Sequence, residues 1–300
     1  MTISIVHYDV CPVCSSTSIH PALNAKDESV SGETFSIWQC DQCTLRFTQD
    51  VPGADRIGAY YKSEEYISHT NISKGLVNRL YQLVRRTTLR QKRKLVCKVT
   101  GKKRGAHLDV GSGTGAFVDE MSRSGWRTKG IEPDDGARKV AKADFNCELG
   151  TTDEFFRLPP SSFDAITLWH VLEHVHDLKI YLGQLKNLLN DNGRLIIAVP
   201  NFTSFDAGTY KEFWAAYDVP RHLYHFSPGA MAKLVETGGM KILSRKPMWF
   251  DSFYVCLLSS KYKNNGKTNW PGAAWIASIS NLNALLHTTK CSSIIYVIGK

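Results

Sequence analysis

The chain has 300 residues, of which 43% are hydrophobic and 22% are charged, and its formal net charge is +9. This composition is ordinary for a globular protein and excludes a disordered chain, a collagen-like chain and a small disulfide scaffold. No uninterrupted apolar run reaches the roughly 18 residues that a spanning helix needs, so we expect no transmembrane segment. The first ten residues lack the features of a signal peptide, so we expect a cytoplasmic protein whose eight cysteines are thiols or metal ligands.

Composition divides the chain into three segments. Residues 1–50 are polar and carry four of the cysteines, and residues 51–103 read as a turn followed by a basic helical connector. Residues 104–300 alternate apolar strand-like runs with helical patterns. Within them, an insertion at 251–290 is rich in aromatic and apolar residues and fits a lid, a dimer contact or plain packing on a sheet edge.

The first segment contains two CxxC pairs. Cys11 and Cys14 form one pair, and Cys40 and Cys43 form the other. Two such pairs close a tetrahedral shell of four thiolates around a metal ion and leave no open position for a substrate. The spacing therefore predicts a zinc ribbon with a structural zinc ion, which would stabilise a segment too short for a core of its own.

Positive charge is concentrated between residues 66 and 108, a stretch with twelve Lys and Arg and no Asp or Glu. One interpretation is a helix that packs one side and leaves its charges in solvent. The other is a surface for an anionic partner, such as nucleic acid, an acidic lipid headgroup or a phosphorylated substrate. Little aromatic sequence is interleaved with the charges, which favours the solvated helix over a nucleic-acid site.

The last segment has the alternating pattern of an α/β protein. Expected strands are 106–110, 127–131, 145–149, 163–168, 193–199, 240–245 and 293–298, and expected helices are 116–123, 135–142, 177–189 and 228–236. Such alternation predicts βαβ units and a doubly wound, mostly parallel seven-stranded sheet. The order of the last two strands suits a final strand that runs in the reverse direction at the sheet edge.

A glycine-rich turn follows the first of these strands. Gly111, Gly113 and Gly115 stand at every second position, which permits positive φ and a close approach of a ligand to the backbone. Glu132 ends the next strand, where a carboxylate can accept both hydroxyls of a ribose. A dinucleotide site is one interpretation. However, Asp109 precedes the turn and would repel a pyrophosphate, so a ligand with a positive centre is favoured.

With these pieces in place, the chain resembles the class I S-adenosylmethionine-dependent methyltransferases. The resemblance rests on LDVGSGTG, GIEPDDGA, FDAITLWHVLEHVHD and NGRLIIAVPN, in family order over residues 104–300. It implies that the Asp109–Gly115 loop holds the methionine part of S-adenosylmethionine and that Glu132 holds its ribose. It also implies that Thr152 or Asp153 lies near the adenine, and that Trp169 and His170 close over the cofactor.

Histidines gather after the fourth and fifth strands, at the carboxyl edge where doubly wound folds bind ligands. Methyl transfer needs alignment and, for many acceptors, a general base. We expect that base to be His222, with His174 and then His225 as the next candidates. Arg221 is expected to clamp an anionic acceptor.

Three branches of the family differ in their acceptor. A cysteine-bearing segment ahead of the catalytic domain resembles the deoxysugar C-methyltransferases, although Arg221 stands where those enzymes have a glutamate. The VLEHV segment resembles the quinone O-methyltransferases, for which the basic helix would touch acidic lipid. A zinc ribbon also precedes certain ribosomal-RNA methyltransferases, but LWHV replaces their Asn/Asp-Pro-Pro-aromatic pocket. We therefore expect a small-molecule acceptor, such as a sugar, a glycan precursor or a lipid-linked metabolite, and keep RNA or a non-enzymatic adaptor as alternatives.

Overall fold

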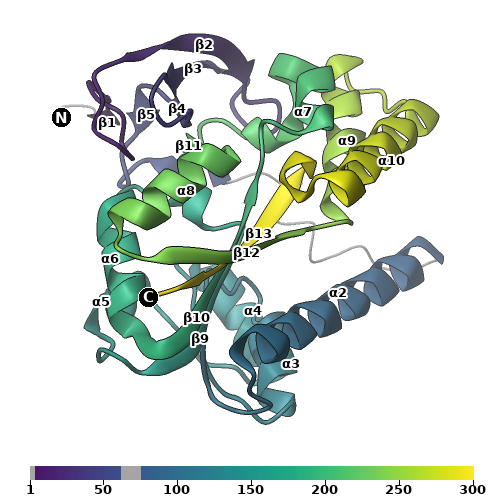
Figure 1. Cartoon of the computed structure of the whole chain (residues 1–300). Helices are drawn as coiled ribbons and strands as arrows, with labels where there is room; N and C mark the ends of the chain where they lie inside the picture. The colour runs from purple at the N-terminus through teal and green to yellow at the C-terminus, as the bar shows by residue number, and fades with distance from the viewer. Residues whose placement is uncertain (1–3, 62–75) are drawn as a thin grey trace.

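The structure is a computed structural model that describes residues 4–61 and 76–300, with only the backbone described for 76–84. Part of the basic stretch, residues 66–75, lies outside the described residues. A twisted seven-stranded sheet forms the centre of the molecule (Figure 1), in the order β12-β13-β10-β9-β6-β7-β8. Its strands are β6 (Ala106–Val110), β7 (Arg127–Ile131), β8 (Leu149–Gly150), β9 (Phe163–Trp169), β10 (Leu189–Pro200), β12 (Lys241–Pro247) and β13 (Ser293–Gly299).

Strand direction follows the sequence prediction. The five strands from β10 to β8 are parallel, and β13 pairs antiparallel with both β10 and β12. Strands β6 and β13 are buried along their whole length. This happens because helices cover both faces of the sheet, and such strands read as continuous rather than alternating apolar runs. The predicted α/β sheet with one reversed strand is confirmed.

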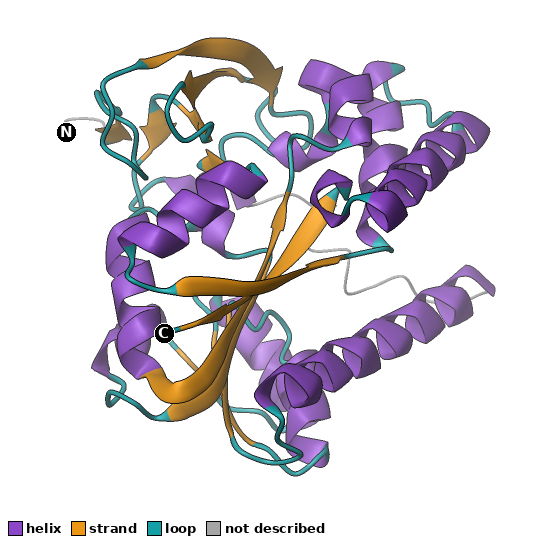
Figure 2. Cartoon of the chain, viewed as in Figure 1, coloured by secondary structure: helices purple, strands orange, loops and turns teal. Residues whose placement is uncertain are grey.

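Helices form a layer on each face of the sheet (Figure 2). The helices on one face are α5 (Thr152–Arg157), α6 (Leu178–Leu188) and α8 (Pro228–Thr237), and those on the other are α2 (Leu76–Thr100), α3 (Ala116–Arg123) and α4 (Asp135–Phe145). The predicted strand at 145–149 is wrong, because α4 continues to Phe145 and Asn146 caps it in a left-handed conformation, with φ 53°. Only Leu149 and Gly150 remain to pair with β7.

The N-terminal segment forms a small four-stranded sheet in which one strand comes from the later part of the chain. The order is β11-β4-β3-β2, with β2 at Ile19–Lys26, β3 at Thr34–Cys40, β4 at Arg46–Thr48 and β11 at Tyr224–His225. A short pair, β1 (Ile5–Val6) with β5 (Val51–Pro52), and the 3₁₀ turn η1 (Ile57–Tyr61) complete it. Because β11 comes from the loop after β10, this segment and the carboxyl edge of the main sheet are packed as one unit.

A helical hairpin stands between β12 and β13. It consists of α9 (Asp251–Lys263) and α10 (Trp270–Leu286), followed by the turn η5 (Thr288–Lys290), and it packs on α7 (Phe205–Tyr210) and the turns η3 (Lys211–Phe213) and η4 (Ala215–Tyr217). Helix α7 was not expected from the sequence, since it has only six residues, yet Ser204 caps it by accepting from the Ala207 N–H. Among the described helices, none is both long and apolar enough to cross a bilayer.

Candidate functional site

The glycine-rich turn connects β6 to α3 at the carboxyl edge of the sheet. Gly111, Gly113 and Gly115 all have positive φ, at 71°, 52° and 78°. A Cβ on Gly111 would collide with the side chain of Val171, whereas one on Gly113 would meet no atom within 4 Å. The turn is therefore packed against protein at one glycine and open at the next, as a loop that admits a ligand to its backbone must be.

Glu132 fixes the shape of this turn. Its carboxylate accepts from the N–H of Gly113 at 2.7 Å and from that of Asp134 at 3.0 Å. Burial raises the pKa of Glu132, although these two N–H groups and Arg138 oppose the rise. Only 8% of the residue is exposed. A carboxylate held in this way is preorganised, and its remaining lone pairs can accept from a ligand's hydroxyls.

Asp109 is buried at the start of the turn and belongs to a chain of hydrogen bonds. The Thr167 hydroxyl donates to Asp109 at 2.6 Å, and it accepts from Nε2 of His107 at 2.9 Å. Burial raises the pKa of Asp109, while the nearby ammonium of Lys92 opposes this rise. The carboxylate is thus oriented by a neighbour on β9 and balanced by a cation on α2.

The sequence reasoning missed Lys92. Its ammonium lies 4.3 Å from the ring centroid of Trp169, and burial lowers its pKa to about 8. Lys92 lies on the same face of α2 as Leu89, Val96 and Val99, which pack toward the sheet. The sequence does contain a signal for this role, because Lys92 stands at helical spacing among the apolar residues on the packed side of α2. A lysine that faces a core needs an acidic partner, which here is Asp109.

Two further cations of the basic segment form ion pairs with the main domain while remaining partly exposed. Besides Lys92, Arg93 pairs with Glu120 at 2.8 Å, and just beyond the helix Lys102 pairs with Asp164 at 2.6 Å. These contacts fit a helix that packs one side on the sheet and leaves its other charges in solvent.

The structure places the other residues predicted to hold the cofactor around the same edge. Thr152 and Asp153 begin α5, directly after β8, where Thr151 forms a capping box with Glu154. Trp169 packs edge-on against Phe117 of α3, with ring centroids 5.7 Å apart. His170 adopts a positive φ of 57° and lies 3.3 Å from Glu173.

Two of the predicted catalytic histidines lie together. The rings of His174 and His222 are edge to face with centroids 4.5 Å apart. The side chain of Glu173 joins them, so that one ligand atom from each of the three residues lies within 4.8 Å of the others. Oε2 of Glu173 is buried and has no hydrogen-bond partner in the described part of the chain. Although burial opposes it, the hydrogen bond with His170 and the nearby histidines lower the pKa of Glu173.

Hydrogen bonds define the tautomers of this pair. Nδ1 of His222 donates to the carbonyl of Ala216 at 2.9 Å. Nδ1 of His174 donates to the carbonyl of Arg221 at 3.0 Å and also lies 3.0 Å from the hydroxyl of Tyr61. Each Nε2 then keeps its lone pair. Burial lowers the pKa of His174 to about 4, so this ring is neutral at pH 7.

His225, the third candidate base, lies in β11 against the N-terminal sheet. The Thr48 hydroxyl donates to the carbonyl of His222 at 2.7 Å, so it accepts from Nε2 of His225 at 3.1 Å. Burial lowers the pKa of His225 well below its usual value. Its ring also packs edge-on against Tyr217, at 5.1 Å.

The expectation that Arg221 clamps an acceptor is wrong. Its side chain is 2% exposed and is paired with two carboxylates of the protein. It bonds both oxygens of Asp218 at 2.7 and 3.0 Å, Oδ1 of Asp27 at 3.0 Å, the carbonyl of Tyr60 at 2.8 Å and the hydroxyl of Ser29. Because the guanidinium is buried and its charge is balanced within the protein, Arg221 ties the N-terminal segment to the loop that carries His222.

The four cysteines predicted as metal ligands converge. Sγ of Cys11 lies 3.5 Å from that of Cys43, Sγ of Cys14 lies 3.5 Å from that of Cys40, and all four lie within 4.8 Å of one another. Zn–S bonds of 2.3 Å in a tetrahedron require sulfur atoms roughly 3.8 Å apart. The donor set and its spacing therefore fit a tetrahedral metal ion with no open position.

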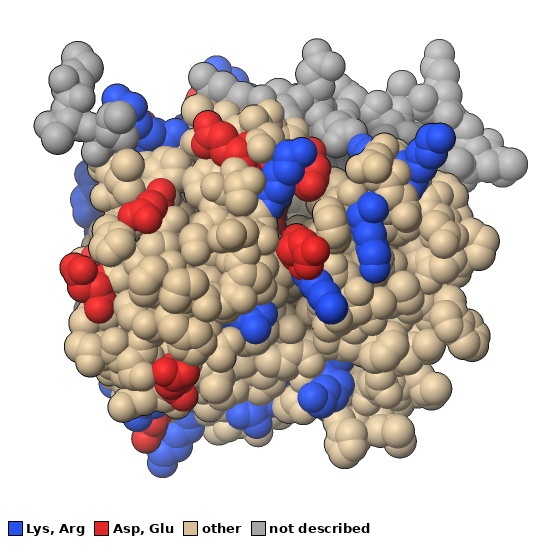
Figure 3. Space-filling view, turned by 90° about the horizontal axis from the view of Figure 1, so that it is seen from above, with Lys and Arg blue, Asp and Glu red and all other residues tan. Residues whose placement is uncertain are grey.

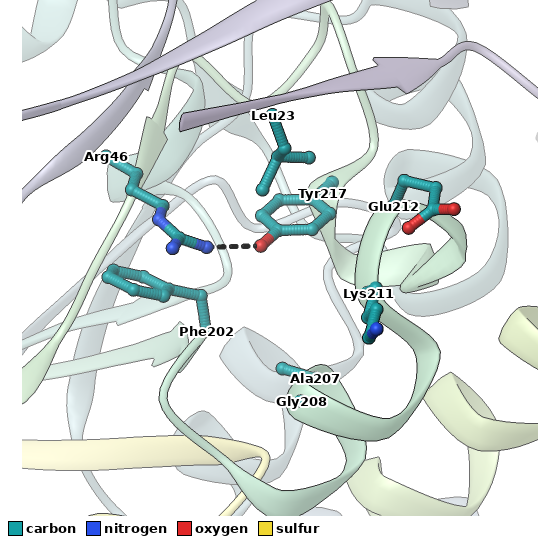
Figure 4. Close-up of a pocket in the computed structure, with 8 residues that line it drawn as sticks. All are labelled: Leu23, Arg46, Phe202, Ala207, Gly208, Lys211, Glu212 and Tyr217. Atoms are coloured by element: carbon teal, nitrogen blue, oxygen red, sulfur yellow. Dashed lines mark hydrogen bonds between the residues drawn. The ribbon is translucent and has the colours of Figure 1, made fainter. Parts of the chain in front are cut away.

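A cavity of about 390 Å³ lies between the N-terminal sheet and α7 (Figure 4). Arg46 enters it from β4, with its guanidinium 4.3 Å above the ring of Phe202, and donates to the Tyr217 hydroxyl at 2.8 Å. Lys211 and Glu212 line the side formed by η3. The cavity is thus lined by two cations, one carboxylate and two aromatic rings, an excess of positive charge that is suited to an anionic ligand with a flat or ring-shaped part.

Comparison with known proteins gives one domain-level match. Residues 81–245, more than half of the chain, match a family model described as a methyltransferase domain. A demethylmenaquinone methyltransferase of Tropheryma whipplei (strain Twist) is 28% identical over 183 residues, which cover 56% of this chain and 77% of that protein. The mitochondrial ubiquinone biosynthesis O-methyltransferase of Homo sapiens is 26% identical over 162 residues, or 49% of this chain and 44% of that protein.

A solved structure shares the fold over almost the whole chain. The 1,6-didemethyltoxoflavin-N1-methyltransferase of Burkholderia thailandensis, bound to 1,6-didemethyltoxoflavin and S-adenosylhomocysteine, superposes with a TM-score of 0.50 at 13% identity. The match covers 92% of this chain and 99% of that chain. At this identity, the likeness is one of fold.

Proposed function

The chain belongs to the methyltransferase domain family and is an S-adenosylmethionine-dependent methyltransferase of small molecules. From this premise, we propose that its acceptor is anionic: a sugar, a glycan precursor or a lipid-linked metabolite. The observation that carries this proposal is the cavity at Arg46, where two cations and two aromatic rings outweigh the single carboxylate of Glu212. Arg46 would take the role that the buried Arg221 does not have.

For the cofactor, we propose that the Asp109–Gly115 loop holds the methionine part and that Glu132 holds the ribose. In support, Asp109 and Lys92 present opposite charges beside one turn, which suits the zwitterionic end of S-adenosylmethionine. The open side of Gly113 leaves room for it. Thr152 or Asp153 would contact the adenine, with Trp169 and His170 over the cofactor.

S-adenosylmethionine supplies an electrophilic methyl group when bound. We propose that His222 accepts the acceptor's proton at Nε2, with His174 as its partner and His225 as the third candidate. The buried carboxylate of Glu173 would stabilise the imidazolium that forms, because it lies within 4.8 Å of both rings. General-base assistance of this kind contributes roughly 10²–10⁴-fold in rate.

For the cysteine cluster, we propose a structural zinc ion held by Cys11, Cys14, Cys40 and Cys43. Four thiolates in two turns leave no site for chemistry, so the ion would hold the small sheet together and with it the position of Thr48 and Arg46. Zinc would thus support the acceptor cavity without touching the acceptor.

The test of the acceptor class is a methyl-transfer assay with labelled S-adenosylmethionine and a panel of nucleotide-linked sugars, lipid-linked sugars and quinols. We expect transfer to an anionic acceptor. Arg46→Gln should raise KM for that acceptor by at least tenfold, whereas Arg127→Gln, at an exposed position on β7, should leave KM unchanged. Transfer to neutral quinols alone, or an unchanged KM in the Arg46 variant, would refute the anionic-acceptor proposal.

A further inference from the structure

Helix α10 presents its large apolar side chains outward. Trp275, Leu282, Leu285 and Leu286 are between 60% and 76% exposed, and Trp270 at the start of the helix is 67% exposed. The opposite side of the helix is buried and is made of small residues: Ala273, Ala277, Ser280 and Ala284. A helix of a globular protein normally buries its large apolar side chains and exposes polar ones.

The orientation of α10 is fixed by its small side. The Ser280 hydroxyl donates to the buried carboxylate of Asp206, which also accepts from Trp214 and Ser292. Asn281 donates to the carbonyl of Trp249 at 2.9 Å. Rotating the helix to bury its tryptophans would break this network and force large side chains into a close helix contact. The exposed apolar stripe is therefore a fixed surface of the fold.

The charges of the chain segment that carries the stripe have one sign beyond Asp251. Helix α10 has no charged residue along its 17 positions. After Asp251 the chain contains no Asp or Glu, whereas Lys263 and Lys267 precede the helix and Lys290 follows it, all three exposed. Figure 3, which looks down on the side of the molecule that carries α7, α9 and α10, shows broad uncharged areas with both Lys or Arg and Asp or Glu side chains among them.

These features match one kind of partner. Tryptophan prefers the interface between water and lipid, and an apolar stripe with a cationic rim is the pattern of helices that lie on anionic membranes. A second copy of the chain fits less well. Two α10 helices paired about a two-fold axis would bring Lys267 of one copy close to Lys290 of the other, and the segment offers no acidic partner for either. No described helix is able to span the bilayer.

We propose that the exposed face of α10, rimmed by Lys263, Lys267 and Lys290, docks the protein on the surface of an anionic lipid membrane. The apolar side chains enter the headgroup region, and the lysines contact anionic headgroups. The inference stands on the surface alone and does not depend on the acceptor.

The test is co-flotation of the full chain with vesicles of phosphatidylcholine, with and without phosphatidylglycerol. We expect binding to the anionic vesicles that weakens as salt is added. The triple variant Trp275→Ser/Leu282→Ser/Leu286→Gln should bind at least about tenfold more weakly. Substituting Lys263 and Lys267 by Gln should each weaken binding to anionic vesicles by about fivefold.

The matched control is Ile180→Ser on α6, because Ile180 is an apolar residue that is 57% exposed on another part of the surface. It should bind as the unmodified chain does, and circular dichroism should show all variants folded. The proposal is overturned if the unmodified chain does not float with anionic vesicles, or if the triple variant floats equally well. It is also overturned if sedimentation shows that the triple variant converts a dimer to a monomer while vesicle binding is absent throughout.

Discussion

Replacing Arg221 by Met should destabilise the protein strongly. The guanidinium is 2% exposed and bonds the carboxylates of Asp27, which is 0% exposed, and Asp218. Methionine fills a similar volume but leaves Asp27 buried opposite an apolar side chain. Removing one partner of a buried ion pair costs about 3–5 kcal/mol.

The pKa of Asp27 provides an independent readout. Burial would raise it, but hydrogen bonds from Ser31 and Arg221 and the charge of Arg221 lower it to about 2. A depressed carboxyl pKa gives stability that is present above pH 4 and is lost as the pH falls toward 2. In Arg221→Met the pKa of Asp27 should rise, so that acid unfolding should begin at a higher pH.

Calorimetry and urea unfolding measure the folding stability that Arg221→Met loses, and this loss should lower Tm by about 10 °C for a chain of this size. Lys26→Met is the control, because Lys26 is 53% exposed and pairs with Glu28 at 3.6 Å, an arrangement worth less than about 1 kcal/mol. If Arg221→Met cost no more than Lys26→Met, the argument that this arginine joins the N-terminal segment to the His222 loop would be refuted.

Three further variants test separate parts of the structure. Burial lowers the pKa of His107 to about 3, so up to about 5 kcal/mol of folding stability should be lost as the pH falls from 6.5 toward 3. Urea unfolding of His107→Gln across this pH range should show a smaller loss, and a pH profile identical to that of the unmodified chain would contradict the conclusion that His107 is buried as a neutral ring. Cys43→Ser should lower the zinc content measured by mass spectrometry from one ion per chain, while Cys97→Ser should not; equal zinc in both would exclude the four-thiolate site. His222→Asn should lower kcat by about 10²–10⁴ with unchanged cofactor affinity, and an unchanged kcat would remove His222 as the base.

Much of the fold could be predicted because its signals are local. The strands at 106–110 and 127–131 were bounded correctly, since the first is followed by the glycine-rich turn and the second by Glu132. The strand expected at 145–149 failed because α4 continues to Phe145 and ends only at Asn146, in a left-handed conformation, and apolar content alone does not distinguish a helix end from a short strand.

The sequence indicated which residues lie at the site, but it did not indicate which of them contact one another across the fold. The proximity of His174 and His222 follows from two strand ends meeting at one edge. The role of Arg221 was not visible, because its partner Asp27 lies 194 residues away in the turn after β2. The cavity at Arg46 was equally hidden, since it exists only where β4 meets the loop after β10.

The most direct measurement of the central claim is calorimetric titration of the protein with S-adenosylmethionine and, separately, with NAD. We predict binding of S-adenosylmethionine alone, with a Kd on the order of micromolar. Glu132→Ala should weaken it at least about tenfold through the loss of charge-assisted hydrogen bonds, with zinc content unchanged, while Glu148→Ala at an exposed position should bind normally. Binding of NAD, or an unaltered affinity in Glu132→Ala, would contradict the assignment of this edge as a methyl-donor site.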